Sequence, residues 1–544
     1  ISGGVRQTLL ILMSAVGLLL FVACANVASL LLVRGASRVR EFAIRSAIGA
    51  GRARVARQLL TENLAIALLG GILGLPIAFG CLRALIVMAP GNLPRVAEIS
   101  LDVPVLLFAA AVTILTGLLA GIAPVFASTK IDVSIALKDG AAAPGRSARG
   151  QRFRSALVTG EIAITLLLSF VSGVLIRSLI AAQSTDPGFN TKDLLALQLQ
   201  APASTYKTDG QIRQFFNAVT ETLRHQPEVL NAGVVTCAPG AGDCGDWWYS
   251  PMDRPAPARP EVPLTLFFSA DTGYFRTMGI RIVAGRDFTV ADSAGSTPVA
   301  VVNQEIARKW WKEPREAIGK LIKFGGPYMD GSPVEIVGVA HNVSQMGLDG
   351  EQEPQMYFPL AQKGSRTMTV MLRTRGDPAT LSPTVRRAIA TLDRNLPVKS
   401  LDVYESTLGA TLSRRRFTTL LLTVFAGLAM FLAAVGIYGV LNYWVSMRTR
   451  EIAVRMALGA SRPAILQWVS GGSLRLALSG LLLGAGSAWM ASRWLGSLVY
   501  GVTPQSPLTM AIAALAVLLL AAAASALPAW RATHVEITKS LRDS

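Results

Sequence analysis

Seven long apolar stretches, separated by short polar loops, dominate the hydropathy pattern of this chain. About 20 apolar residues in a helix cross the roughly 30 Å hydrocarbon core of a bilayer. One such stretch could equally form a buried core helix, but seven together predict an α-helical integral membrane protein. They cover residues 8–33, 62–88, 103–126, 155–179, 417–445, 470–497 and 507–530.

A polar segment, residues 184–412, lies between the fourth and fifth stretches and has the pattern of an α+β domain. Apolar residues recur at helical spacing in QIRQFFNAVTETLRHQ, which predicts an amphipathic helix with one buried side. That side would hold Ile212, Phe215, Phe216, Val219 and Leu223. The runs PVAVVNQ, VEIVGVA and TMTVMLR, bounded by Gly, Pro and Asp, predict short strands.

The distribution of charge predicts the orientation in the membrane. The 184–412 segment carries 23 basic and 24 acidic residues, so the formal net charge of +18 arises outside it. Basic residues gather between stretches one and two, three and four, and five and six. The loops at 89–102 and 498–506 together contain a single basic residue, Arg95. Lys and Arg are enriched on cytoplasmic loops, so 184–412 is expected outside the cytoplasm. Three arginines, 414–416, oppose this rule at the outer end of the fifth stretch.

The cysteines allow one disulfide bond without requiring it, and the cysteine and histidine content argues against metal binding. Cys237 and Cys244 lie in the polar TCAPGAGDCG loop and could form a disulfide in an extracytoplasmic domain, or remain free thiols. The chain has four Cys and three His without zinc-type spacing, so no metal is expected. The basic residues form no aromatic-interleaved surface, so no nucleic-acid partner is expected.

A dodecapeptide occurs twice, as EFAIRSAIGAGR at 41–52 and as EIAVRMALGASR at 451–462. Glu41 with Arg45, and Glu451 with Arg455, stand four residues apart and can bridge on one helical face. Gly49 and Gly459 can end the first helix. Ser461, Arg462 and Pro463 then read as the start of a second helix. Each copy is either an interfacial anchor or a protein-docking surface, and the residues alone do not separate these readings.

The surrounding sequence repeats as well. After each dodecapeptide come a Gly-rich apolar stretch, a short loop and a further stretch, and Pro124 and Pro528 begin similar tails at 124–140 and 528–544. The expected architecture is a tandem duplication, with a first repeat that has lost its beginning. The first half divides at 1–33 (first helix), 34–61 (coupling region one), 62–126 (two helices) and 127–154 (linker). The second half divides at 155–183 (helix), 184–412 (outer domain) and 413–544 (three helices, coupling helix 447–462 and tail 529–544).

The repeated motif, together with LPAWRATHVEITKSLR at the end, resembles the FtsX/MacB-type permeases of ATP-binding cassette systems. The outer runs DPGFNTKDLL, YFRTMGIRIVAGRDF, VAVVNQEIARKWW and IGKLIKFG resemble the MacB-like periplasmic core domain. Two units in one chain resemble the duplicated orphan permeases of that superfamily, here as an N-terminally truncated fragment. The resemblance implies a multi-pass protein of the bacterial inner membrane.

The resemblance also implies a mechanism. A separate ATPase would bind the coupling helices at the cytoplasmic face, and its motion would move the outer domain, in efflux with a periplasmic adaptor. Such duplicated permeases need not have an obvious ATPase. Lipoprotein or envelope-lipid extraction and a signalling scaffold that controls a hydrolase or sensor kinase are the alternatives. The coupling residues matched to the family motif are Glu41, Arg45, Gly49, Arg52, Glu451, Arg455, Gly459 and Arg462.

Catalysis by this chain itself is not expected. The only Gly-Lys pair, Gly319-Lys320, is followed by Leu321 and has Pro314 where a phosphate-binding loop needs its first Gly. No cofactor and no catalytic residues are therefore predicted.

Two polar residues within apolar stretches, Glu161 and Asn26, could have a functional or a structural role. Glu161 stands about two helical turns from Arg152 and Arg154, so we expect its carboxylate to reach the inner interface or to pair with an arginine rather than to bind a proton or substrate. Asn26 is expected to hydrogen-bond between helices. The outer aromatic cluster Trp247, Trp248 and Tyr249 is assigned no site.

Overall fold

The computed structural model describes residues 2–37, 52–88, 100–128 and 148–532, except for 243, 256, 330, 346–351, 394–395, 397, 459 and 497–498. The chain divides into two compact units. The membrane unit contains Ile1–Ile180 and Arg415–Ser544, and the outer unit contains Ala181–Arg414.

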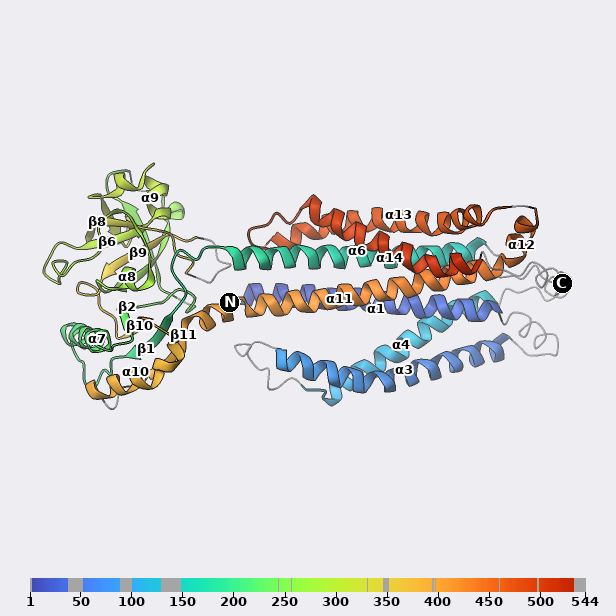
Figure 1. The fold of residues 1–544 in the computed structure, drawn as a ribbon, viewed down its shortest axis with the longest axis horizontal. Helices are drawn as coiled ribbons and strands as arrows, with labels where there is room; N and C mark the ends of the chain where they lie inside the picture. Colours follow the sequence, from blue (N-terminus) through green and yellow to red (C-terminus); the bar gives the residue numbers. More distant parts are fainter. Residues whose placement is uncertain are drawn as a thin grey trace. The chain divides into compact units, whose positions relative to one another are not determined.

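Long helices form the membrane unit (Figure 1). Within the described residues, six are long and apolar enough to cross a membrane, at Thr8–Leu30, Leu60–Met88, Arg152–Ser184, Arg415–Ser446, Leu474–Leu495 and Pro507–Arg531. A shorter apolar stretch, Val103–Leu118, lies in the remaining helix. The predicted α-helical membrane fold is therefore confirmed. The helices are α1 (Ser2–Ser37), α3 (Arg52–Met88), α4 (Val103–Ser128), α6 (Ala148–Ser184), α11 (Tyr404–Met447), α12 (Thr449–Ala457), α13 (Arg462–Leu495) and α14 (Pro507–Ala532).

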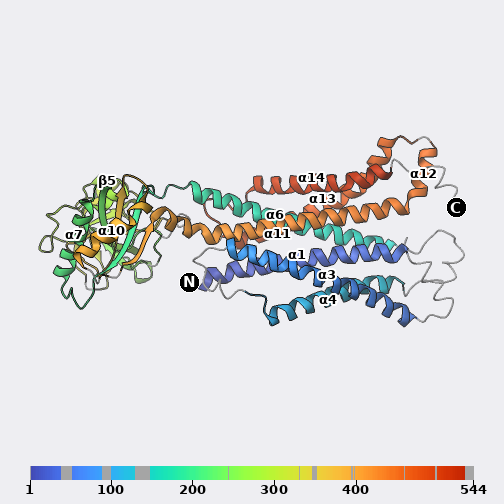
Figure 2. The same cartoon turned by 60° about the horizontal axis from the view of Figure 1, so that its bottom comes forward.

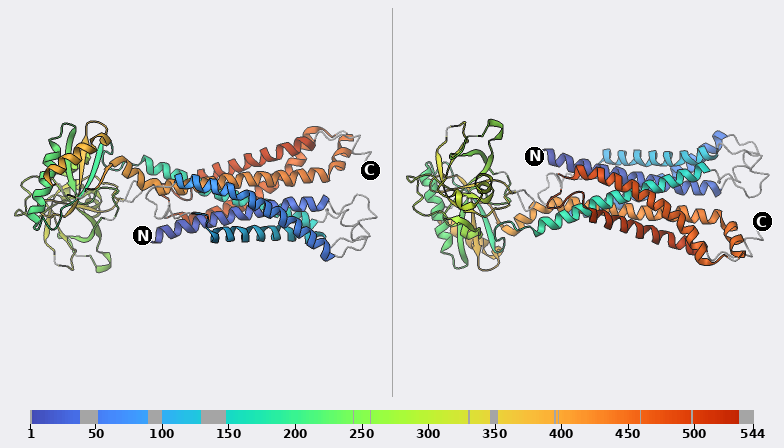
Figure 3. Two further views of the ribbon diagram at one scale, coloured as in Figure 1. Left: turned by 90° about the horizontal axis from the view of Figure 1, so that it is seen from below. Right: turned by 90° about the horizontal axis from the view of Figure 1, so that it is seen from above.

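The helices of the membrane unit form three groups. In Figures 1 and 2, α3 and α4 lie on one side and α13 and α14 on the other, with α1, α6 and α11 between them. The further views in Figure 3 agree with this order. Corresponding helices of the two predicted repeats, α3–α4 and α13–α14, thus occupy opposite sides of a shared centre.

Glycines in both Gly-rich stretches allow helices to approach closely. A Cβ added to Gly71 of α3 would lie 3.1 Å from Thr113 of α4, and one added to Gly480 of α13 would lie 2.7 Å from Ile162 of α6. Association of helices in lipid depends on such packing, because lipid tails are as apolar as the side chains themselves.

Arg415, one of the three opposing arginines, hydrogen-bonds a serine inside the membrane unit. Arg415 donates a hydrogen bond from Nη1 to Ser178 Oγ over 3.2 Å, and Ser178 Oγ also accepts the Tyr500 backbone N–H at 2.7 Å. The guanidinium of Arg415 is therefore engaged at the end of the bundle.

The described part of the outer unit contains eleven strands, of which six close into a barrel. Strands β4, β3, β7, β8, β6 and β9 follow one another, and parallel pairing of β9 with β4 completes the ring. Its interior packs apolar side chains, among them Tyr249, Ile336 and Met356. The strands are β1 (Leu194–Gln200), β2 (Val229–Val235), β3 (Asp246–Pro251), β4 (Leu264–Ala270), β5 (Ile282–Gly285), β6 (Val299–Asn303), β7 (Leu321–Phe324), β8 (Pro333–Ala340), β9 (Gln355–Pro359), β10 (Thr367–Thr374) and β11 (Val398–Val403).

An open antiparallel sheet, in the order β11-β1-β10-β2, joins the barrel where Val235 of β2 pairs with Ala270 of β4. Helices α7 (Asp209–Arg224) and α10 (Pro378–Leu392) pack on this sheet. The predicted amphipathic helix is α7, and its five predicted core residues are buried. Thr208 caps it with a capping box, which satisfies backbone N–H groups of the first turn. The three predicted strands are β6, β8 and β10. Short helices α8 (Tyr274–Met278) and α9 (Gln304–Trp310) complete the unit.

Candidate functional site

The second dodecapeptide folds as a short helix between two candidate spans. Helix α11 ends at Met447, α12 covers Thr449–Ala457, and α13 begins at Arg462. Helix α12 lies at the end of the bundle where α11 turns into α13 (Figure 1). Leu458 forms its C-cap and Gly459 lies outside the described residues. Ser461 occupies the N-cap position of α13 without a side-chain hydrogen bond, and Pro463 fits the first turn because that turn needs no N–H from it.

The predicted i,i+4 ion pair is present on α12. Arg455 Nη2 lies 2.8 Å from Glu451 Oε1, and Arg448 Nη1 lies 3.9 Å from Glu451 Oε2. The three side chains are about 40% exposed, at 43%, 40% and 37%. Exposed pairs of this kind contribute about 0–1 kcal/mol each, so the ion pair alone does not hold α12 in place.

Two tryptophans that the motif did not reveal fix α12 to its neighbours. The rings of Trp444 in α11 and Trp468 in α13 have centroids 4.6 Å apart. The guanidinium of Arg455 lies 4.1 Å from the Trp468 centroid, and that of Arg448 lies 4.5 Å from the Trp444 centroid. Cation–π contacts are worth about 0.5–2 kcal/mol. Both arginines therefore contribute to packing as well as to charge.

The underside of α12 is apolar and well packed. Ile452 is fully buried, in a cluster with Val445 of α11, Ile465 of α13 and Ala529 of α14. Three long helices thus contribute side chains to the apolar cluster that buries Ile452.

The opposite side of α12 exposes apolar surface at its C-terminal end. Leu458 is 83% exposed and Val454 is 42% exposed. Beside the charged Glu451 and Arg455, they form a mixed apolar and charged surface, here called the α12 surface and defined by Glu451, Val454, Arg455 and Leu458. Such a combination suits protein contact, because a buried leucine contributes about 1.5–3 kcal/mol.

The first dodecapeptide falls largely outside the described residues. These residues include Glu41, Arg45 and Gly49, while Arg52 is the first residue of α3. The 410-residue offset aligns Trp444 with Arg34 and Trp468 with Gln58. The tryptophan pair thus belongs to the second copy alone, although both copies contain the Glu and Arg residues of the motif.

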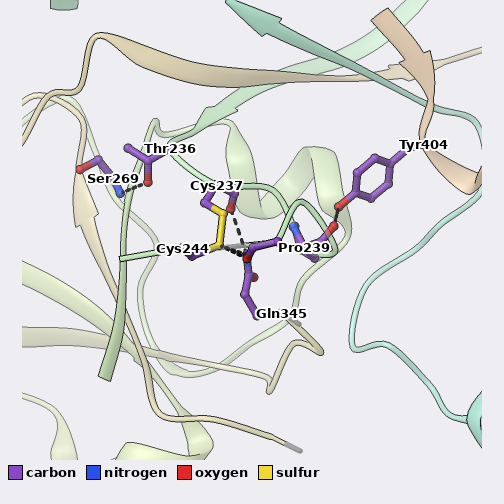
Figure 4. Close-up of a disulfide and its surroundings, with 8 residues drawn as sticks. Thr236, Cys237, Pro239, Cys244, Ser269, Gln345 and Tyr404 are labelled. Carbon is purple, nitrogen blue, oxygen red and sulfur yellow. Dashed lines mark hydrogen bonds between the residues drawn. A yellow bond between two sulfur atoms is a disulfide. The ribbon is translucent and has the colours of Figure 1, made fainter. Parts of the chain in front are cut away.

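In the outer unit, Cys237 and Cys244 form a disulfide, one of the two alternatives that the sequence left open (Figure 4). Gln345 holds the loop, because its Nε2 donates to Cys237 O at 3.2 Å and lies 3.3 Å from Cys244 Sγ. The Tyr404 hydroxyl donates to Pro239 O inside the same loop (Figure 4). Tyr404 is buried and is the first residue of α11. The disulfide loop therefore packs against the first turn of that helix.

The expectation for Glu161 was wrong. Its side chain is fully buried, and neither carboxyl oxygen has a hydrogen-bond partner within the described chain. The spacing along α6 to Arg152 and Arg154 carries no information on the other helices, which surround Glu161 in the structure. Asn26, by contrast, makes the predicted interhelical bond, from Nδ2 to Leu432 O of α11 at 2.8 Å.

The aromatic cluster of the outer unit divides between surface and core. Trp247 and Trp248 are 38% and 42% exposed, whereas Tyr249 is fully buried in the barrel. Among the described residues, no group of three or more His, Cys, Asp or Glu side chains could hold a metal ion.

Comparison with known proteins assigns the two units separately. Residues 13–133 and 423–537 match the FtsX-like permease C-terminal model, so that domain occurs twice. Residues 155–388 match the MacB-like periplasmic core domain.

Characterised and uncharacterised permeases are similar over parts of the chain. The macrolide export ATP-binding/permease protein MacB of Nitrobacter winogradskyi is 27% identical over 52% of this chain and 44% of its own length. The pyoverdine export ATP-binding/permease protein PvdT of Pseudomonas syringae is 31% identical over 41% of this chain and 35% of its own.

The uncharacterized ABC transporter permease YknZ of Bacillus subtilis is 28% identical over 39% of this chain and 54% of its own. The chain thus spans about half, or less, of the length of these relatives. With two FtsX-like regions flanking a MacB-like periplasmic core, this multi-pass inner-membrane protein with an extracytoplasmic segment belongs to the FtsX/MacB-like permeases of the ABC type.

Proposed function

We propose that this permease couples ATP hydrolysis by a separate ATPase subunit to motion of its outer unit, in an efflux process. The observation that supports the proposal most directly is the α12 surface. It joins an exposed leucine to a charged pair on a helix that is braced against α11, α13 and α14. An ATPase that binds this surface would move a rigid element rather than a flexible loop.

The continuity of α11 supports the second half of the proposal. This helix begins at Tyr404, which is buried in the outer unit, and continues through the span Arg415–Ser446 to Met447, two residues before α12. A helix resists bending because each turn is hydrogen-bonded to the next. Displacement of α12 would therefore be passed along α11 to the residues around Tyr404. This mechanism needs no conduction channel for substrate through the bilayer.

Efflux is favoured over the alternatives by the export functions in the names of MacB and PvdT. A periplasmic adaptor would then receive the moving outer unit. Lipoprotein or envelope-lipid extraction and a signalling role use the same motion with a different output. In all three, hydrolysis takes place on a partner and the two dodecapeptides serve as its contacts, with Glu41, Arg45, Gly49 and Arg52 in the first copy.

Leu458→Asp tests docking at the α12 surface. Loss of a buried leucine contact should weaken ATPase binding by about 10- to 100-fold. Because Leu458 is 83% exposed, the fold should be unaffected. The measurement is co-purification of full-length protein with an identified ABC ATPase in detergent. Val290→Asp is the matched control, since Val290 is 90% exposed in the outer unit.

A second variant tests whether the partner recognises the positions of the two charges on α12. Exchange of the pair, Glu451→Arg with Arg455→Glu, keeps an i,i+4 pair on α12 but inverts the charges presented to a partner. Co-purification should fall. The melting temperature should fall only by what the lost contact of Arg455 with Trp468 and the lost Arg448–Glu451 pair contribute, about 0.5–2 kcal/mol for the first. ATPase binding that survives both this exchange and Leu458→Asp would place the contact elsewhere and overturn the docking proposal.

A further inference from the structure

Two polar side chains whose oxygen atoms lack hydrogen-bond partners within the described chain meet where three helices of the membrane unit pack together. Glu161 lies on α6, Asn26 on α1, and both face Gly436 of α11. A Cβ on Gly436 would overlap Glu161 Oε2 and would lie 2.7 Å from Asn26 Oδ1. Neither Glu161 oxygen nor Asn26 Oδ1 has a hydrogen-bond partner within the described chain. The missing side chain at Gly436 thus leaves the space that both polar groups enter.

The orientation of the Asn26 amide follows from its other contact. Asn26 Nδ2 donates to Leu432 O at 2.8 Å. A carbonyl oxygen can only accept, so a flipped amide would place two acceptors against each other. Oδ1 must therefore be the atom that faces Glu161, and it offers an acceptor and no hydrogen.

This arrangement suits a protonated Glu161 and opposes an ionised one. A carboxylate can only accept hydrogen bonds, and here it would face a second acceptor. Nearby Thr165 cannot donate to it, because its hydroxyl already bonds Glu161 O at 2.7 Å and approaches Ala429 O at 3.3 Å. The neighbours Val158, Ile162 and Leu166 are apolar and buried. An unpaired charge in such surroundings is costly, whereas a carboxylic acid can donate to Asn26 Oδ1.

Several charged and titratable groups described on the surrounding helices have other contacts or are exposed. On α6, the Arg154 guanidinium lies 4.2 Å from the ring centroid of Tyr443 in α11. Also on α11, the Tyr438 hydroxyl accepts from Arg531 Nη1 of α14 at 3.2 Å. Arg6 of α1 and Arg475 of α13 are exposed. Cys24 of α1 donates to Thr116 of α4.

We propose that Glu161 and Asn26 form a proton-binding site inside the membrane unit, and that the bound proton stabilises the packing of α1 against α6 and α11. The ligand is a proton on Glu161, shared by hydrogen bond with Asn26 Oδ1. Because linkage is reciprocal, separation of these helices would release the proton, and proton binding would favour their contact. The site joins α1 of the first FtsX-like region and α11 of the second through Glu161 of α6, and it does not depend on ATPase docking.

The test is infrared difference spectroscopy of the full-length protein in lipid bilayers at pH 7. Wild type minus Glu161→Gln should show the C=O stretching band of a carboxylic acid, because Gln keeps a donor toward Asn26 and removes the acid. Loss of carboxylate bands instead of that acid band would overturn the proposal. A Glu161 band that appears or disappears when Na⁺ or K⁺ replaces choline would also overturn it, in favour of a bound metal cation.

Asn26→Leu supplies a second, independent arm. The acid band of Glu161 should persist but move to higher frequency, because the hydroxyl of the carboxylic acid no longer donates to Asn26 Oδ1. An unshifted band would show that Asn26 is not the acceptor, even if Glu161→Gln failed to fold. Glu221→Gln is the matched control, because Glu221 is exposed on α7 of the outer unit and its substitution should leave the acid band unchanged.

Discussion

Lys363 shows how two effects of one environment compete at a single residue. Its amine lies 4.0 Å from the ring centroid of Phe324 and 4.5 and 4.7 Å from those of Phe267 and Phe358. Burial lowers the pKa of Lys363 to about 8 from its ordinary value of 10.5. The ring faces oppose that shift, because they attract the ammonium ion and not the neutral amine.

If burial prevails, acylation of Lys363 by an amine-specific reagent should be half-maximal near pH 8. The native state would then bind fewer protons than the unfolded state between pH 8 and 10.5, so this residue would make stability rise with pH across that window. Mass spectrometry of tryptic peptides gives the labelling profile, and exposed Lys312 serves as an internal reference. A midpoint that stays near 10.5 would mean that the three rings prevail.

Single residues also show what the sequence could and could not predict. Ile212, Phe215 and Phe216 were placed correctly because helical periodicity is a local property. Glu161 was misplaced because its burial depends on α1 and α11, which are distant in sequence. Trp444 and Trp468 were missed for the same reason, since nothing in the sequence around either residue indicates that their rings meet.

At the scale of elements, the two dodecapeptides share a motif, but the residues that flank them in the sequence differ. Helix α12 is held by Trp444 and Trp468, whereas the first copy has Arg34 and Gln58 at the corresponding positions. We infer that the tryptophan pair lets the second copy transmit force, because its neighbours fix α12 without help from a partner.

The disulfide loop and the first turn of α11 form another coupled pair of elements. Removal of the bond by Cys237→Ser with Cys244→Ser should lower the stability of the outer unit by about 2–3 kcal/mol, the value for so short a loop in the chain-entropy model. Because Tyr404 donates to Pro239 in this loop, hydrogen exchange should accelerate in the loop and in the first turn of α11. Exchange in α7 is the internal control, and acceleration confined to the loop would show that Tyr404 is seated independently of the disulfide.

At the scale of the whole molecule, composition predicted a membrane protein with an α+β outer unit, but it could not predict the barrel. Its closure joins β4 to β9 across about 90 residues, in a parallel pairing that runs from Leu266 opposite Gln355 to Ala270 opposite Pro359. Pairing of such distant strands leaves no periodic signal in either strand. The duplication, in contrast, was visible because similar helices repeat similar residues.

Sidedness is the property on which the proposed function of the whole chain depends. Val290 of the outer unit and Leu458 beside α12 are both highly exposed, at 90% and 83%, so either position accepts a cysteine without loss of packing. In intact cells, a thiol reagent that cannot cross the membrane should label Val290→Cys and spare Leu458→Cys, and permeabilisation should expose the latter. The unmodified chain measures background from Cys24 and Cys81, its free cysteines. Basic loops predict this result because Lys and Arg remain on the cytoplasmic side. Labelling of Leu458→Cys before permeabilisation would put the α12 surface on the wrong side for any cytoplasmic ATPase, whatever its affinity.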